Sequence, residues 1–398
     1  MDSITIYTAE IDDLQAAAEE LFSQLEGFKF KKHTLGVLHI EEDTEYPELY
    51  RVLSERFDFP IVGCTALGMF LGKQGYCNMG IGLMLLTADD CEFSVGITGK
   101  LDRDNYRDEI FKTYGAAREK LPSPPKLVIS FGGTVTDERS VSGDDVIAAI
   151  DEAGGGVPIF GGNASDGYNF TGYRVFCNDS VIREGQVMAL VSGNIRPKFV
   201  MSNAAGNRAN VSYEVTEAKS NQVMRLGDDT FLATLRRENM AVDKTEVLGD
   251  YLISPFLLTL SRESGDSVKV ARNLALLNQE TGAGSFLGSV PEGSILSIGI
   301  IDRSDVQNSV KETFDTMFDA IEEAKGEYHT LLCGSCIARF MALAGNASEE
   351  AAAFVGRLPS DISLLGFYTY GEYCPVKGNK TGREYNLFHN FTFTLMAI

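Results

Sequence analysis

The chain has 398 residues, of which 44% are hydrophobic, so it is long enough to bury a sizeable core and to form two domains. Its 56 acidic and 35 basic side chains leave a net charge of −21. This negative charge repels phosphate backbones and anionic lipid, which argues against nucleic acid or a membrane surface as a partner.

The sequence shows no signal-peptide pattern at its start and no apolar run long enough to span a bilayer. We therefore expect a cytoplasmic protein without membrane insertion. The seven cysteines are odd in number and widely spread, which is typical of reduced thiols and not of a disulfide framework.

Short β-rich runs alternate with amphipathic helices along most of the chain, and the same order occurs three times. Each time the order is strand, helix, strand, helix, strand. The first set is at 4–9, 12–25, 34–40, 46–57 and 60–68; the second is at 93–99, 105–121, 126–133, 143–154 and 157–167; the third is at 296–302, 304–324, 330–336, 337–358 and 362–373.

This pattern predicts an α/β fold in which helices flank mixed sheets built from repeated β-α-β-α-β-hairpin units. The units are expected at residues 1–95, 93–192 and 295–398. Each third strand leads into a Gly-rich or polar turn, around Cys64, Gly162 and Phe367, and such strand-end turns are common ligand sites.

Residues 198–293 have a different sequence pattern, in which apolar and polar residues alternate as in a β-hairpin at 211–227 and further strand-like segments follow. The shift in composition where this segment begins predicts a boundary between two domains, at 1–199 and 200–398.

Several motifs together resemble a FIST-N domain followed by a FIST-C domain. They are PIVGCTALG, VPIFGGNASDG with its following hairpin, VPEGSILSIGIID, the pair Cys336 and Arg339, and GFYTYGEY followed by HNFT. The resemblance covers nearly the whole chain. It implies a FIST-N-like domain at 1–199, a FIST-C-like domain at 200–398, and a sensory role in which a small ligand such as an amino acid is bound.

Two positions depart from the family pattern. Met69 and Phe70 stand where the resemblance calls for an acidic residue, and Cys333 is an additional cysteine. Because FIST sequence occupies both ends of the chain, we expect that any signal passes to a separate partner protein, or that the protein only binds its ligand.

The segment LLCGSCIARF contains a CxxC, Cys333 to Cys336, between a predicted strand and a predicted helix. A thiol at a helix N-terminus near an arginine often has a lowered pKa, which fits a redox dithiol. The surrounding order is not that of thioredoxin, so an inert, semi-buried pair is the favoured interpretation. A zinc site would need a second cysteine or histidine pair, which the sequence lacks.

Haem is an alternative cofactor, because some FIST proteins bind it as nitric-oxide sensors. Its candidate ligands are His33, His39, His329, His389 and Cys374. A lone histidine is more often structural, so no cofactor is the main expectation.

A small-molecule site is the favoured interpretation of the C-terminal motifs. Arg339 offers a planar fork for a carboxylate, and Glu372 offers an acceptor for an ammonium group. The full predicted ligand-binding set is Arg339, Glu372, Cys336, Phe367, Tyr368, Asn163, Asp166 and Asn390. The alternative for Arg339 and Glu372 is that they pair with each other. Arg339 is expected on an exposed rim, so that its truncation leaves the fold intact.

An enzyme is the competing class of function. A Cys336 nucleophile with His389 as its base is conceivable, but the sequence contains no GxSxG, P-loop, HExxH or GxGxxG motif. We therefore expect a binding protein that has no catalytic residues.

Overall fold

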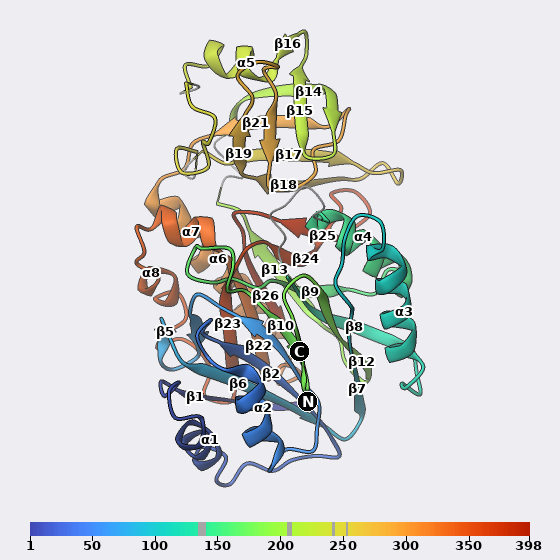
Figure 1. The fold of residues 1–398 in the computed structure, drawn as a ribbon, viewed down its shortest axis with the longest axis vertical. Coiled ribbons are helices and arrows are strands. Elements are labelled where there is room, and N and C mark those ends of the chain that lie inside the picture. The colour runs from blue at the N-terminus through green and yellow to red at the C-terminus, as the bar shows by residue number, and fades with distance from the viewer. Residues whose placement is uncertain (134–140, 205–208, 241–242, 252–253) are drawn as a thin grey trace.

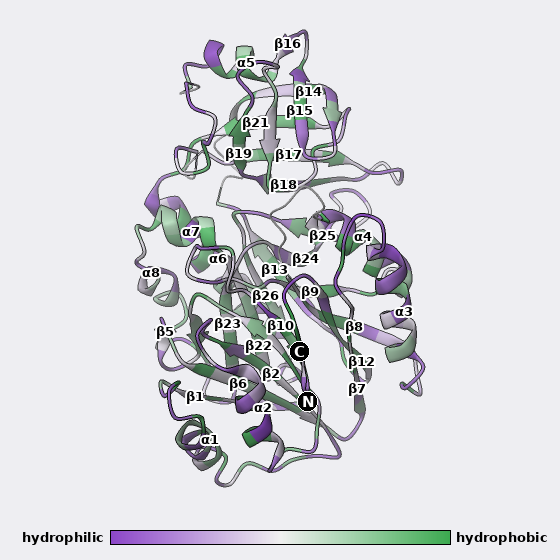
Figure 2. Ribbon diagram, viewed as in Figure 1, coloured by the Kyte–Doolittle hydropathy of each residue, from purple (hydrophilic) through white to green (hydrophobic). Residues whose placement is uncertain are grey.

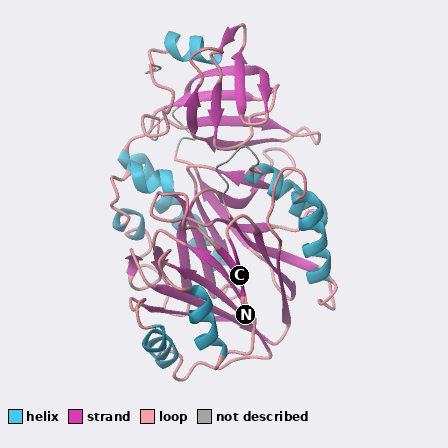
Figure 3. Ribbon diagram, viewed as in Figure 1, coloured by secondary structure: helices cyan, strands magenta, loops and turns pink. Residues whose placement is uncertain are grey.

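The computed structural model describes residues 1–133, 141–204, 209–240, 243–251 and 254–398. These residues form a layered body and, above it in the view of Figure 1, a separate mostly β part that contains the inserted sheet. In the body the strands lie inside and the helices lie at the periphery (Figure 3).

Three six-stranded sheets build the body. In spatial order, the strands of the first sheet are β1 (Asp2–Thr8), β6 (Ile81–Ala88), β2 (His33–Ile40), β3 (Ile61–Thr65), β10 (Val175–Cys177) and β11 (Ser180–Ile182). Those of the second are β7 (Cys91–Ile97), β12 (Gln186–Gly193), β8 (Pro125–Gly132), β9 (Ile159–Asn163), β24 (Glu372–Lys377) and β25 (Glu384–His389). Those of the third are β13 (Lys198–Ser202), β26 (Phe393–Ala397), β22 (Thr330–Cys336), β23 (Ser363–Thr369), β4 (Met69–Leu71) and β5 (Gly75–Cys77).

The three sheets share one pattern of strand directions. The central pair is parallel in each, as β2 with β3, β8 with β9, and β22 with β23. The flanking pairs are antiparallel. Cys64, Gly162 and Phe367 fall on the equivalent strands β3, β9 and β23, which confirms the predicted repeat.

Each repeat gives its hairpin to another repeat's sheet. The hairpin β4–β5 of the first unit extends the third sheet, β10–β11 of the second unit extends the first, and β24–β25 of the third unit extends the second. The exchange pairs an edge of each sheet that would otherwise expose unpaired backbone groups, and it ties the three units together.

Helices cover the outer faces of the sheets, as their apolar stripes require. The first sheet carries α1 (Leu14–Ser23) and α2 (Tyr46–Ser54), the second α3 (Tyr106–Arg118) and α4 (Gly143–Gly154), and the third α6 (Arg303–Glu323), α7 (Ile337–Ala342) and α8 (Ser348–Ala351). Figure 2 shows hydrophobic stretches along the strands of the body and hydrophilic ones on loops and outer helical turns.

The prediction of one helix over 337–358 is wrong, because α7 and α8 are separate. Ala344 and Gly345 between them adopt φ angles of 54° and 79°. That left-handed conformation ends a helix and suits glycine.

The centre of the body is an aromatic cluster with one residue from each sheet. The ring of His39 lies 4.2 Å from that of Phe367 and 5.3 Å from that of Phe131. Phe131 and Phe367 are 5.8 Å apart. Phe367 therefore packs in the core between the sheets.

The inserted sheet interrupts the third unit between β13 and α6. Its strands are β18 (Ser267–Arg272), β17 (Phe256–Ser261), β21 (Ile295–Gly299), β14 (Ala209–Lys219), β15 (Gln222–Leu226), β20 (Gly284–Phe286), β19 (Leu274–Leu277) and β16 (Asp229–Thr230), with the helix α5 (Phe231–Arg237) beside them. It has its own core, in which the rings of Phe231, Phe256 and Phe286 pack together.

The predicted first strand of the third unit, at 296–302, is corrected by this arrangement. Most of that run is β21, which pairs with β14 and β17 of the inserted sheet, while β13 takes the first-strand position beside β26. The sequence pattern of a strand followed by a helix is the same whether the strand joins the sheet that the helix covers or a different sheet. The sequence alone therefore did not show that this strand belongs to the inserted sheet. The boundary between 199 and 200 stays a prediction.

No helix among the residues placed in the structure combines the length and the apolarity needed to cross a membrane.

Candidate functional site

A cavity of about 810 Å³ lies where the inserted sheet meets the body. From the body it is lined by, among others, Asn163, Tyr168, Phe170, Gln186, Cys336, Tyr370 and Asn390. From the inserted part it is lined by, among others, Asn221, Asn273, Ala275, Leu276 and Phe286. Interfaces between parts of a protein are a common place for small-molecule sites.

Three predicted site residues, Asn163, Cys336 and Asn390, lie together in the wall of this cavity. Asn163 ends β9, Cys336 ends β22 and is the N-cap of α7, and Asn390 follows β25. The other five predicted residues are not among the described lining residues of the cavity, and they are Arg339, Glu372, Phe367, Tyr368 and Asp166.

Arg339 is fully buried, so the expectation of an exposed rim position is wrong. Its Nε donates to Glu350 Oε1 at 2.8 Å. Its Nη2 donates to the Val306 carbonyl at 3.1 Å and to Ser309 Oγ at 3.0 Å. The ion-pair partner of Arg339 is thus Glu350 on α8, and not Glu372 as the alternative interpretation supposed.

The Glu350 carboxylate accepts further hydrogen bonds from hydroxyl groups of the third unit. Tyr368 OH donates to Glu350 Oε2 at 2.7 Å, and Ser335 Oγ donates to the same atom at 2.8 Å. Burial and the adjacent Glu350 raise the pKa of Tyr368 well above its usual value. This buried network fixes α7, α8 and β23 to one another.

Glu372 is buried in a separate cluster. Its carboxylate accepts from the hydroxyls of Thr369 and Thr392, both at 2.5 Å. Burial raises the pKa of Glu372 to about 7, although these hydrogen bonds act in the opposite direction. The Cys336 thiol lies close to Glu372, and burial together with that carboxyl raises the thiol's pKa well above its usual value.

Asp166 holds the loop that follows β9. Its carboxylate accepts from the backbone N–H groups of Phe170, Thr171 and Gly172 at 2.8–3.2 Å, and from Tyr370 OH at 2.5 Å. Asp166 therefore shapes the cavity through its neighbours, because Phe170 and Tyr370 line it.

The residues that the inserted sheet contributes, above all Asn273, Leu276 and Phe286, were not among the predicted site residues. An asparagine in a strand-rich segment carries no local signal of a site. Only the fold of the inserted sheet against the body brings Asn273 into the same cavity lining as Asn390.

The CxxC does not form a dithiol site. Cys333 and Cys336 both lie in β22, three residues apart, so their side chains point to opposite faces of the strand. Cys333 packs in the core under α6, and Cys336 packs in another cluster with Ala338 and Phe391. An extended span of three residues is about 10 Å, whereas a disulfide needs Cα atoms within about 7 Å.

We therefore expect no Cys333–Cys336 disulfide after mild oxidation of the folded protein. Mass spectrometry of peptides from non-reduced, alkylated protein checks this. The expectation is overturned if the oxidised protein yields the linked peptide without loss of its near-UV circular dichroism.

The buried histidines are held neutral. Burial lowers the pKa of His39 to about 3 and that of His389 to about 4. His389 Nε2–H donates to the Cys374 carbonyl at 2.9 Å. In the described part of the chain, no three His, Cys, Asp or Glu side chains are grouped so that they could hold a metal ion. An absorption spectrum of the purified protein tests the haem alternative.

Comparisons with known proteins agree with the resemblance in the motifs. The FIST N domain model matches residues 34–229, and the FIST C domain model matches residues 235–375. No curated protein matches the chain.

Among solved structures, the chain is similar to the cyanuric acid hydrolase from A. caulinodans, with 8% sequence identity and a TM-score of 0.36 over 100% of this chain and 98% of that one. A second similar structure, described as a cyanuric acid hydrolase that arose by structural concatenation, has 10% identity and a TM-score of 0.29, and covers 75% of this chain and 98% of that one. Likenesses this weak carry no argument about function. The two domain models together span most of the chain, which therefore belongs to the FIST family.

Proposed function

We propose that this FIST protein is a non-enzymatic sensor that binds a small molecule in the cavity between the inserted sheet and the body. The observation that carries the proposal is the cavity itself, which combines about 810 Å³ of space with aromatic walls and a few buried polar groups. It also gathers three of the residues that the family motifs pointed to, Asn163, Cys336 and Asn390.

The position of the cavity supports a sensory role. A ligand there contacts both the inserted sheet and the body, so it stabilises arrangements in which the two parts are close. Such a change can be read by a separate partner protein. A cytoplasmic location fits the composition and belongs to the same proposal.

The ligand class suggested by the motifs is an amino acid or another carboxylate. Arg339 is engaged by Glu350, so the carboxylate would need another partner. A panel of amino and carboxylic acids tests this class directly.

A blocked cavity should abolish binding. Ala275 lines the cavity and is partly exposed, so Ala275→Trp should fill the space without loss of the fold. Native mass spectrometry of the protein incubated with a metabolite extract should show a retained compound in the native chain and not in this variant.

Ala218→Trp is the matched control. Ala218 is also partly exposed and lies on the inserted sheet, but it is not among the described lining residues. Equal retention by the native chain and by Ala275→Trp would refute the site, and turnover of the retained compound would refute the non-enzymatic role.

A further inference from the structure

Two asparagines in the cavity wall keep polar atoms without a partner although both residues are buried. Asn273 is 1% exposed, and neither its Nδ2 nor its Oδ1 has a hydrogen-bond partner. Asn390 is 2% exposed; its Nδ2 donates to the His389 carbonyl at 3.1 Å, while its Oδ1 has no partner. Buried amides are almost always paired, so these atoms indicate a ligand that supplies both an acceptor and donors.

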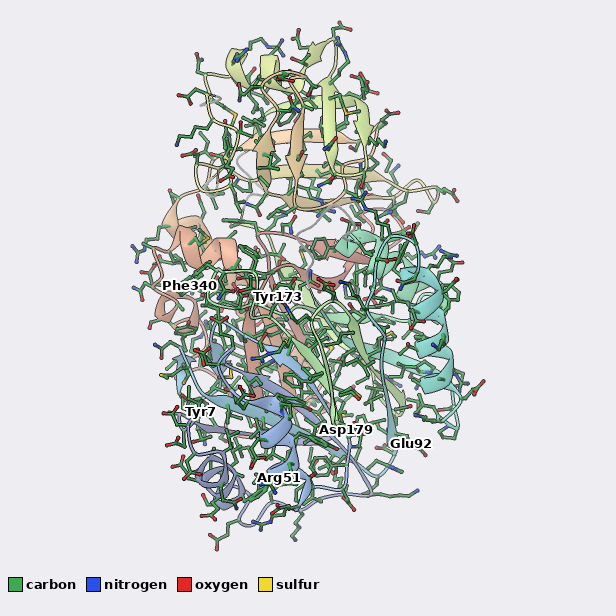
Figure 4. The ribbon with its side chains drawn as sticks, viewed as in Figure 1. Tyr7, Arg51, Glu92, Tyr173, Asp179 and Phe340 are labelled. Atoms are coloured by element: carbon green, nitrogen blue, oxygen red, sulfur yellow. The ribbon has the colours of Figure 1, made fainter. Side chains whose placement is uncertain are left out.

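Aromatic rings form another part of the same wall. Phe170 stacks on Tyr370 with ring centres 4.6 Å apart, and Tyr168 approaches Phe340 of α7 at 6.2 Å. Figure 4 labels Phe340 together with Tyr173, which lies just beyond the loop that carries Tyr168 and Phe170.

Tyr168 and Phe170 are held in an unfavourable backbone conformation. Their φ angles are 71° and 55°, in the left-handed region that bulky side chains rarely adopt. The Asp166 carboxylate holds the loop by accepting hydrogen bonds from the N–H groups of Phe170 and Thr171. Strain of this kind is concentrated at ligand clamps, and here it keeps two partly exposed rings at the cavity.

The described lining of the cavity carries no excess of positive charge that would attract an anion. The charged residues among its described lining are Arg103, Asp145 and Glu184, and Glu184 is paired with Lys100. The remaining polar lining is neutral and rich in amides: Asn163, Gln186, Asn221, Gln222, Asn273 and Asn390. With a net charge of −21 on the whole chain, a phosphorylated ligand is disfavoured.

We propose that the cavity binds an uncharged, planar heterocycle with a hydrogen-bond donor and an acceptor side by side on one edge, of the chemical class of nucleobases and nucleosides; this rests on the proposed function. A carboxamide presents a donor and an acceptor in one plane, which matches such an edge in a bidentate manner. Aromatic side chains stack on the faces of these rings. The Asn273 amide recognises the edge, and Phe170 with Tyr370 recognises the face.

The test is isothermal titration calorimetry of the full chain with uracil, hypoxanthine, adenosine, adenosine monophosphate, and a set of amino and carboxylic acids. At least one of the three neutral heterocycles should bind, and adenosine monophosphate should bind more weakly than adenosine. Phe170→Ala should weaken that binding about tenfold or more. The control is Phe111→Ala, which removes a similarly exposed ring on α3 outside the described lining and should have no effect.

Asn273→Leu separates a ligand role from a structural role. Because the amide has no partner in the protein, replacing it with an apolar group of similar size should leave the melting temperature without ligand unchanged or raised. The same change should weaken heterocycle binding at least tenfold. A lowered melting temperature together with unchanged binding would overturn the assignment.

Other outcomes bear differently on the two proposals. If amino or carboxylic acids bind and the heterocycles do not, the ligand class is wrong and the cavity's function stands. If a heterocycle binds equally well to Ala275→Trp, it binds elsewhere; the heterocycle proposal then fails, and the metabolite-extract experiment decides the function. If no compound of the panel binds, the heterocycle class is wrong, and the metabolite-extract experiment decides the function.

Discussion

Arg339→Ala should lower the free energy of unfolding by about 3–5 kcal/mol, because it leaves a buried carboxylate without its cationic partner. Arg339 and Glu350 are both fully buried and 2.8 Å apart. The truncation also removes the donors to the Val306 carbonyl and to Ser309 Oγ. The expectation from sequence alone, that the fold tolerates this change, is thus reversed by the burial of the side chain.

Urea unfolding followed by circular dichroism measures this effect. Arg339→Lys should recover part of the loss, because an ammonium group keeps the charge but not the planar set of donors. The matched control is Arg51→Ala, which breaks an exposed ion-pair cluster on α2 and should leave the urea midpoint almost unchanged. Arg51 is labelled in Figure 4. An Arg339→Ala protein as stable as the native chain would show that the network contributes little.

Glu372 should make the native chain less stable as the pH rises from about 4.5 to about 7. Burial raises the pKa of this carboxyl from 4.5 to about 7, so between these values the folded state holds a proton that the unfolded state has lost. The stability is therefore greatest below the unfolded pKa and is lost as the pH rises through the folded pKa. At about 1.4 kcal/mol per pKa unit, the loss from this group is about 3 kcal/mol.

Glu372→Gln isolates this contribution, because the amide does not titrate. Urea unfolding of both proteins from pH 4.5 to pH 8 should show the native chain losing about 3 kcal/mol relative to the variant. Glu384→Gln, at an exposed position of β25, is the control and should follow the native curve. Parallel curves for the native chain and Glu372→Gln would show that folding does not raise the pKa of Glu372.

The expected effects at Arg339 and Glu372 are effects on stability and not on ligand recognition. Arg339 and Glu372 were the natural candidates for binding a zwitterion, since one offers a cation and the other an anion. In the structure each has its partners inside the protein, Arg339 in Glu350 and Glu372 in the hydroxyls of Thr369 and Thr392. Substitution of either residue should therefore change the free energy of unfolding directly. It should change ligand binding only as a consequence of that loss of stability.

Local patterns in the sequence determined much of the body. The apolar stripe over Val306, Val310, Phe314 and Met317 marks the buried face of α6, because a helix with one apolar face must pack it against the protein. The threefold return of strand, helix, strand, helix, strand placed Cys64, Gly162 and Phe367 on equivalent strands. These features depend on residues close together in sequence, so they could be predicted from the sequence without knowledge of the tertiary structure.

Only the tertiary structure decided which distant segments meet. The hairpin exchange places β4 beside β23, almost three hundred residues away in sequence. Backbone hydrogen bonds hold this pair, and because every residue has the same backbone groups, no pattern of side chains in the sequence indicates it. Arg339 is buried with Glu350, which α8 brings to it. The hydrophobic periodicity of a helix shows that one of its faces is covered, but it does not show which element covers that face. The cavity exists because the inserted sheet places Asn273 in the same lining as the body's Asn390, and bringing residues so far apart in sequence to one cavity depends on the packing of whole elements.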